Sequence, residues 1–302
     1  MSLKIVRASD PITVERINLC LYAPPGVGKT SMAFTADAPL LLDFDQGAHR
    51  AANRKDSVRV TAWGDVADLT AEDLEPYRTV IVDTAGRALD TLTADIIRRN
   101  PKAGRGGALT LQGYGTLKAE FVAWLKALNA IGKDVLLIAH MDEQRNGDDI
   151  IERLDVQGGS KGEIYKAADA MGRIAIRESK RVLLFSPTDA AFGKNPGQLE
   201  PMEVPHPDKD PDFLAGVVKK IKDRLNAMTA EQSKAHAELE KWRETIHALE
   251  TADDFNGQAG AIKTAPKAAQ ALFAHAAKDK GLVADAKAKK YVSKEEHAEA
   301  RR

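Results

Sequence analysis

The sequence has a single cysteine, and it lacks both long apolar runs and an excess of charge of either sign. Because one cysteine cannot form an intramolecular disulfide or a cysteine-based metal site, Cys20 fits a reducing compartment. The longest apolar runs, such as VLLIA at 135–139, are far shorter than a membrane span. The N-terminal residues MSLKIVRASD also lack the apolar core of a secretory signal. We therefore expect a cytoplasmic protein without membrane contact.

The charges balance, with 44 Lys and Arg against 44 Asp and Glu, and the pI is about 7.1. Net charge therefore gives no sign of a nucleic-acid partner, and any such binding must use local basic patches. A chain of 302 residues exceeds one typical domain, and 43% hydrophobic residues can form a proper core. These values favour a large core followed by a smaller region.

Short apolar runs alternate with helical stretches over the first two hundred residues, which predicts an α/β fold with a parallel sheet. The expected strands are residues 17–22, 39–44, 57–62, 79–83 and 134–139, and the expected helices are 29–36, 86–99 and 115–131. Residues 171–204 alternate strands with turns, which predicts antiparallel additions to one edge of the sheet.

Proline and charge cluster at 205–212 (PHPDKDPD), which predicts a linker. We expect a core over residues 1–207 and a helical C-terminal region over 213–302 with a role in protein interaction or assembly. In that region Leu239, Trp242, Ile246 and Leu249 repeat at helical spacing and form one apolar stripe. We expect this stripe to pack internally, and a partner-binding role for the tryptophan is the alternative.

The stretch LYAPPGVGKTSM at 21–32 nearly matches the phosphate-binding loop G-x-x-x-x-G-K-[ST], with Ala23 in place of the first glycine. It follows an apolar strand and opens a helix, so backbone N–H groups can converge on phosphates. Lys29 is expected to neutralise the β- and γ-phosphates, and the Thr30 hydroxyl to bind Mg²⁺. The expected nucleotide-binding residues are Pro25, Gly26, Val27, Gly28, Lys29, Thr30 and Ser31.

Polar side chains stand at the ends of three other apolar strands. Asp83 ends TVIVD, the position of a Walker B carboxylate that supports Mg²⁺, so we expect ATP and Mg²⁺ as cofactors. In LLLDFDQG, Asp43 and Asp45 point to one face, and they reach the nucleotide if their strand adjoins the P-loop strand. We favour Asp45 as the general base, with a solvated carboxylate as the alternative. His140 ends VLLIAH and is either a γ-phosphate sensor or a structural histidine.

This order of parts resembles a RecA-type ATPase core, in which the acidic residue matching Asp45 is catalytic and the sensor strand ends near His140. The segment 157–174 is similar to the second DNA-binding loop of RecA and its following strand, and 98–115 occupies the place of the first. GKNPGQ at 193–198 is similar to a segment of RadA-like proteins, which implies that Lys194 reaches the nucleotide of a neighbouring subunit.

Binding of single strands requires basic side chains and aromatic faces for base stacking. Both loops contain such residues, although each cluster alone is more often a solvated loop than a DNA contact. The expected DNA-binding residues are Arg98, Arg99, Lys102, Arg105 and Tyr114 in the first loop, and Lys161, Tyr165 and Lys166 in the second.

The whole pattern most resembles the phage-encoded short RecA-like ATPases of the single-strand annealing recombinase type (the Sak-four group, phage nucleotide-binding AAA proteins). The resemblance implies an ATP hydrolase that binds single-stranded DNA in the host cytoplasm and supports phage recombination by annealing or strand exchange. It also implies a homo-oligomer, either ring or filament. The position of the C-terminal region after a linker suits a docking module for a single-strand-binding protein or a neighbouring subunit. A helicase or helicase loader on the same core is the alternative, and an ATP-switched regulatory protein without DNA binding is the third reading.

Overall fold

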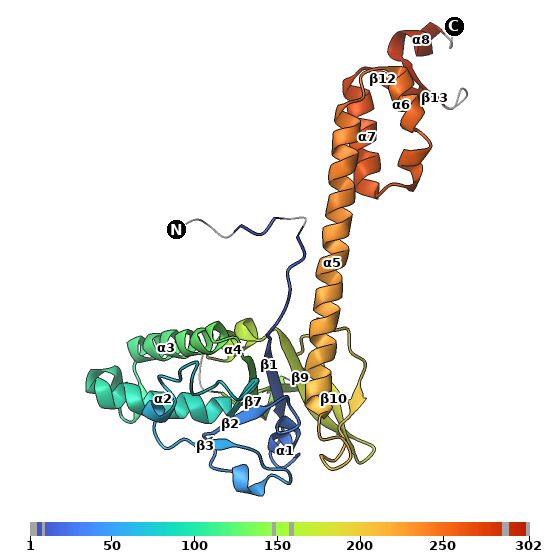
Figure 1. The fold of residues 1–302 in the computed structure, drawn as a ribbon. Helices are drawn as coiled ribbons and strands as arrows, with labels where there is room; N and C mark the ends of the chain where they lie inside the picture. Colours follow the sequence, from blue (N-terminus) through green and yellow to red (C-terminus); the bar gives the residue numbers. More distant parts are fainter. Residues whose placement is uncertain (1–4, 8–9, 147–148, 157–159, 286–289, 300–302) are drawn as a thin grey trace. The chain divides into compact units, whose positions relative to one another are not determined.

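The computed structural model describes residues 5–7, 10–146, 149–156, 160–285 and 290–299 (Figure 1). The chain divides into two compact units, one of residues Val14–Leu225 and one of Met1–Thr13 together with Asn226–Arg302. No helix in the described part of the chain is both long and apolar enough to span a membrane.

The first unit contains a sheet that has nine strands within the described residues, and most of its central pairs are parallel. Its order is β3-β2-β4-β7-β1-β9-β10-β11, with β8 paired to β7. The strands are β1 (Asn18–Ala23), β2 (Pro39–Asp43), β3 (Ser57–Arg59), β4 (Thr79–Asp83), β7 (Asp134–Asn146), β8 (Asp149–Leu154), β9 (Ala170–Arg177), β10 (Lys180–Leu184) and β11 (Met202–Glu203). The predicted α/β class, with a mainly parallel central sheet and antiparallel strands at one edge, is therefore confirmed.

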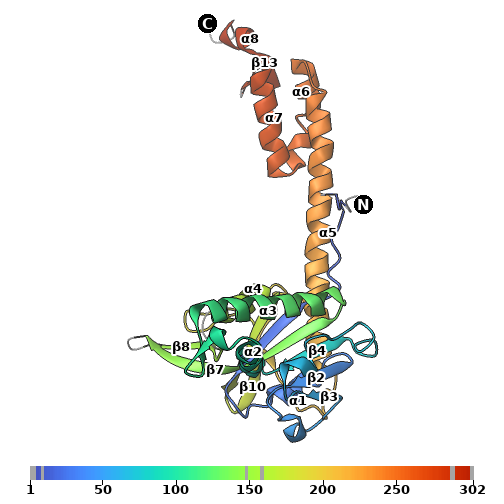
Figure 2. The ribbon, with the colours of Figure 1, turned by 90° about the vertical axis from the view of Figure 1, so that its left-hand side faces the viewer.

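Alternating side chains of the strands feed two separate cores, one on each face of the sheet. Cys20 and Tyr22 of β1 face a core formed with α2 (Ala85–Arg99), α3 (Leu111–Ala130) and α4 (Ser160–Ala167), and α3 and α4 lie side by side over the sheet (Figure 2). Leu19 and Leu21 face the other core, with α1 (Lys29–Ala33) and the start of α5 (Phe213–His247). Burial raises the pKa of the Cys20 thiol to about 12, so this thiol stays protonated.

Several elements differ from the predicted ones. Strand β9 pairs parallel to β1, so the antiparallel additions begin only at β10. Strand β7 continues past the expected end at residue 139 to Asn146 and forms a hairpin with β8. Between α2 and α3 lie η3 (Pro101–Ala103) and the small hairpin of β5 (Gly104–Arg105) and β6 (Ala108–Leu109). The short 3-10 helices η1 (Ala48–Arg50) and η2 (Trp63–Asp65) follow β2 and β3.

The start of α5 belongs to the first unit, which differs from the predicted boundary at 205–212. Leu214, Val217 and Ile221 are buried in the core of that unit, so the apolar face of the helix continues the sheet packing past the proline-rich segment. Thr35, just after α1, binds the helix start: its hydroxyl accepts from the Leu214 N–H at 3.0 Å. A proline-rich and charged composition therefore does not mark the end of packing here.

The second unit has its own core, which includes the predicted apolar stripe. Ile246 and Leu249 are buried, and Leu239 and Trp242 pack against them beside Phe255. The other elements are α6 (Ala252–Gln258), η4 (Ala261–Thr264), α7 (Lys267–Asp279), α8 (Lys294–Glu299) and a hairpin of β12 (Leu282–Asp285) and β13 (Lys290–Ser293). The region is mainly helical, as expected, and the hairpin is an addition.

Candidate functional site

The phosphate-binding loop joins β1 to α1 at the carboxyl edge of the sheet. Gly26 and Gly28 have φ angles of 80° and 82°, a left-handed conformation that favours glycine. Ala23 is fully buried as the last residue of β1, where the backbone is an ordinary strand. The missing first glycine therefore lies in the strand and leaves the phosphate loop unchanged.

Lys29 is the first residue of α1, and the residue as a whole is buried. It donates to the carbonyl oxygens of Ala23 at 3.0 Å and Pro24 at 2.8 Å, and lies 3.3 Å from Nδ1 of His140. Burial lowers the pKa of Lys29 to about 8, against the opposing effect of the nearby Asp83 and Asp45 carboxylates. A nucleotide phosphate would compete with the two carbonyls for this ammonium group and favour its charged form.

Thr30 and Asp83 lie together as a Mg²⁺ site requires. The Thr30 hydroxyl donates to Oδ2 of Asp83 at 2.6 Å. Burial raises the pKa of Asp83, although the Thr30 hydrogen bond opposes this shift. No cluster of three or more His, Cys, Asp or Glu suited to a metal occurs in the described part of the chain. The Thr30–Asp83 pair fits Mg²⁺, which protein sites hold through one or two side chains together with phosphate oxygens and water.

The two aspartates of the DFD segment have different roles. Asp43 is buried and accepts from the backbone N–H groups of Gly47 at 2.9 Å and Ala48 at 3.0 Å, so it stabilises the following loop. Asp45 instead lies at the nucleotide pocket, with Oδ2 at 3.4 Å from Nε2 of His140. Hydrogen bonding with His140 and the nearby Arg87 guanidinium lower the pKa of Asp45, which keeps it ionised as a base must be.

Asp45 reaches the pocket by a route that differs from the expected one. Strand β2 does not adjoin β1, because β4 and β7 lie between them. After β2 the chain turns over the end of β4, and the N–H groups of Phe44 and Asp45 donate to the Asp83 carbonyl at 2.9 and 3.1 Å. These two bonds hold the base beside the Walker B carboxylate.

His140 connects the lysine and the base. Its Nδ1 faces Lys29 and its Nε2 faces Asp45, as given above. Because a charged ammonium group can only donate, Nδ1 accepts, and the ring proton therefore resides on Nε2 and points to Asp45. The resulting chain of hydrogen bonds runs from the phosphate-binding lysine to the base.

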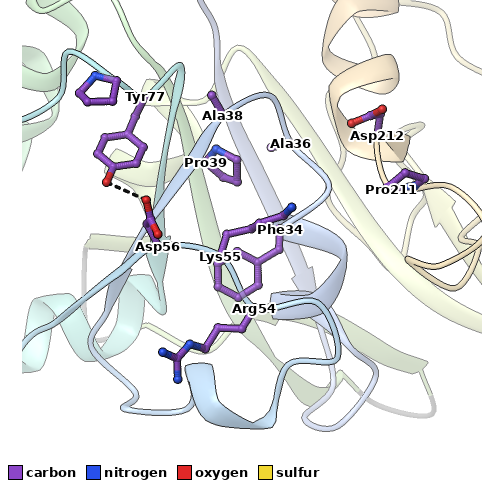
Figure 3. A pocket seen from close by; sticks show the side chains of 11 residues that line it. Phe34, Ala36, Ala38, Pro39, Arg54, Lys55, Asp56, Tyr77, Pro211 and Asp212 are labelled. Atoms are coloured by element: carbon purple, nitrogen blue, oxygen red, sulfur yellow. Dashed lines mark hydrogen bonds between the residues drawn. The ribbon is translucent and has the colours of Figure 1, made fainter.

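These groups surround a pocket of about 230 Å³. Its lining comes from the P-loop, the segment after β2, and the ends of β4 and β7: Gly26, Gly28, Lys29, Thr30, Ser31, Asp45, Gly47, Arg50, Ala51, Asp83 and His140. A larger cavity of about 610 Å³ lies at the opposite edge of the sheet, between Tyr77, which donates to Asp56, and Pro211 and Asp212 (Figure 3). Because it contains none of the phosphate-binding or acidic groups above, we assign nucleotide binding to the smaller pocket.

The sequence profile of a family described as "AAA domain" matches residues 15–196. The chain belongs to the AAA domain family. Among solved structures it is similar to the KaiC-like protein PH0186 from the hyperthermophilic archaeon Pyrococcus horikoshii OT3, with 9% sequence identity, 62% of this chain and 84% of that chain covered, and a TM-score of 0.34. No curated protein has a significant sequence match.

The AAA domain contains two arginines near the nucleotide site that the sequence motifs did not indicate, one that lines the pocket and one that pairs with Asp45. Arg50 lines the pocket from η1, and Nε of Arg87, on α2, lies 3.4 Å from Oδ1 of Asp45. Each arginine follows a motif aspartate by a few residues. In the sequence, only their positive charge next to DFDQG and DTAG could have indicated a role at the nucleotide site.

Lys194 lies outside the pocket of its own AAA domain. Its ammonium group donates to the carbonyl oxygens of Tyr165 and, at 2.7 Å, Ala168. These carbonyls lie at the C-terminal end of α4, where a cation is favourable. The lysine therefore caps a helix within its own chain, and its contact with a neighbouring nucleotide stays a prediction.

The predicted first DNA loop contains ordered elements and paired charges. Arg98 and Arg99 both bind Asp95, at 2.6 and 2.7 Å, and Arg99 also binds Glu120. Lys102 and Arg105 are exposed at η3 and β5, and Tyr114 is 37% exposed on α3. Arg98 and Arg99 are thus held by carboxylate partners. Lys102, Arg105 and Tyr114 provide two exposed cations and an exposed aromatic ring.

The predicted second loop is only partly described, since residues 157–159 and the side chain of Lys161 lie outside the described residues. Tyr165 is half-buried, and its ring packs on Phe192 with centroids 4.4 Å apart, so this face is not open for stacking on a base. Lys166 is exposed and donates to Glu163 at 3.0 Å. One face of the Tyr165 ring is therefore used for packing, and its contact with DNA stays a prediction.

Proposed function

We propose that this P-loop AAA domain is a Mg²⁺-dependent ATPase that acts on single-stranded DNA in recombination, by annealing or strand exchange. The observation that carries the ATPase part is the convergence of Lys29, the Thr30–Asp83 pair and the Asp45–His140 pair on one pocket. Thr30 and Asp83 would hold Mg²⁺, which would supply positive charge to stabilise the phosphates during transfer.

The roles of the side chains follow from their contacts. Lys29 binds the β- and γ-phosphates, and Asp45 orients and deprotonates the attacking water. His140 donates to Asp45 and so holds the base in place. Because His140 also contacts Lys29, a movement of the lysine ammonium group affects the histidine directly. When a phosphate competes for the lysine, the hydrogen-bond chain through His140 rearranges.

Two features support DNA as the coupled partner. His140 belongs to β7, which continues directly into the hairpin with β8, where Arg145 is exposed and Ile150 is 53% exposed. At the end of the α2–α3 pair, Lys102, Arg105 and Tyr114 combine exposed cations with an exposed ring, the combination that single-strand binding uses. The same strand thus joins the nucleotide-sensing residue to an exposed hairpin.

The ATPase rate with and without single-stranded DNA tests the proposal. We expect Mg²⁺-dependent hydrolysis that single strands stimulate, together with annealing of complementary strands. Directional unwinding of a forked duplex would instead identify a helicase. Hydrolysis that DNA does not change, with no DNA binding, would identify an ATP-switched regulator and refute the DNA part alone.

For the second unit we propose a docking role, with a single-strand-binding protein or a neighbouring subunit as the partner. Its separate core supports this role, because it can carry a surface that does not depend on the nucleotide site. A chain truncated after Leu225 tests it, since residues 213–225 are part of the first unit. We expect ATPase activity to persist and assembly or partner recruitment to be lost; retention of both would refute the role.

A further inference from the structure

Arg181 on β10 makes an unusual set of contacts with the phosphate-binding loop. Its Nη1 donates to the Val27 carbonyl at 3.4 Å, and its Nη2 donates to the carbonyls of Val204 at 3.4 Å and Pro205 at 2.8 Å. The described residues place no carboxylate within ion-pair distance of this half-buried guanidinium. Its positive charge is therefore satisfied by carbonyl oxygens alone.

The guanidinium also lies directly over Gly28. A Cβ atom at that position would be 2.6 Å from Nη1 of Arg181, closer than atoms can approach. The positive φ of Gly28 favours glycine, and the missing side chain leaves the space into which the end of Arg181 extends.

These contacts lead to a role in nucleotide binding. The backbone N–H groups of the P-loop bind phosphate only when the loop keeps its shape. The Arg181 guanidinium bonds the Val27 carbonyl from β10 and so restrains the shape of the loop. Its unneutralised positive charge also raises the electrostatic potential at the loop, where an anion binds. Arg181 does not line the nucleotide pocket, so it acts through the loop.

We propose that Arg181 is a positioning residue that sets nucleotide affinity by holding the P-loop and supplying positive charge beside it. The inference rests on the proposed ATPase function. Because the loop cradles the phosphates that ATP and ADP share, Arg181 affects the two nucleotides equally. The Asp45–His140 pair lies elsewhere in the pocket, so Arg181 changes affinity rather than the rate of the chemical step.

The test is calorimetric titration of ADP and a non-hydrolysable ATP analogue, together with steady-state kinetics. For Arg181→Gln we expect Kd to rise about tenfold for both nucleotides, with kcat within about threefold of wild type. Arg181→Lys keeps the positive charge but lacks the planar guanidinium with its two donor nitrogens, so we expect Kd to rise about threefold. The matched control is Lys180→Gln: this exposed neighbour points to the opposite face of β10, pairs with Glu203 at 2.8 Å and should leave Kd unchanged.

Wild-type affinity in Arg181→Gln would overturn the inference, as would equal weakening in Lys180→Gln or a fall in kcat without a change in Kd. If Arg181→Gln does not fold, Arg181→Lys decides, and unchanged affinity in that variant overturns the inference. A wild-type protein that binds no nucleotide would instead refute the proposed ATPase together with this inference.

Discussion

Charged residues at the carboxyl edge of the sheet and at the end of the α2–α3 pair behave differently. At the sheet edge, Lys29 and Asp83 are buried, and each bonds a group from another segment of the chain. At the helix pair, Arg98 and Arg99 lie on the surface and bind Asp95 of their own helix. Buried charges need specific partners, whereas exposed ones are screened by water. A basic composition therefore says less about function than a motif whose geometry brings distant groups together.

The largest effect should come from Lys29→Ala. Removing the ammonium group leaves the phosphates without their main cation, so we expect no measurable ATP hydrolysis and much weaker nucleotide binding. Phosphate release measures the first and calorimetry the second. Lys126→Ala is the control, because this lysine is exposed on α3, and it should hydrolyse ATP normally. Normal hydrolysis in Lys29→Ala would show that the buried charge at the sheet edge matters no more to function than an exposed charge on the helix pair.

Asp45→Asn should slow turnover by about 10²-fold or more, because an amide cannot accept the proton of water. ATP affinity should stay near that of wild type, since Asp45 is not a phosphate ligand. Single-turnover kinetics separate the two quantities. Asp43→Asn provides the contrast, because Asp43 bonds Gly47 and Ala48, and its loss should mainly lower thermal stability. A larger turnover defect in Asp43→Asn would reverse the assignment of the base.

Nucleotide affinity should fall with rising pH. Lys29 has a pKa lowered from 10.5 to about 8, so its charged form predominates at pH 7 and is lost as pH rises through this value. Since only the ammonium form attracts phosphate, Kd for ADP should rise about tenfold between pH 7 and 9. A titration series measures this change. Arg at position 29 remains charged throughout, so Lys29→Arg should lack the pH dependence; a flat wild-type profile would contradict the lowered pKa.

The smallest effect concerns DNA. Lys102→Ala with Arg105→Ala should reduce the slope of log affinity against log salt by up to about 1.4, at roughly 0.7 for each phosphate contact on a single strand. Arg98→Ala with Arg99→Ala should change it less, because their carboxylate partners already neutralise them. Fluorescence anisotropy at several salt concentrations measures both. An unchanged slope in both variants would show that this region does not contact DNA.

The nucleotide site was more predictable than its surroundings because its motifs are local. The P-loop glycines, Lys29 and Thr30 lie within a few consecutive residues, and each strand–loop–helix step was readable from apolar patterning. The position of Asp45 was also expected, but for an incomplete reason. It reaches the pocket across the end of β4, so β2 and β1 do not have to be adjacent strands.

The sequence alone determined the α/β class, the phosphate loop and the aspartate at the end of β4, because these depend on backbone conformation and on side-chain alternation along single segments. Only the tertiary structure decided that His140 joins Lys29 to Asp45, that Lys194 caps α4 and that Arg181 bonds the P-loop. Each of these contacts joins segments far apart in the chain. Strand order and the course of the loops determine which distant residues meet, and local patterning carries little information about either.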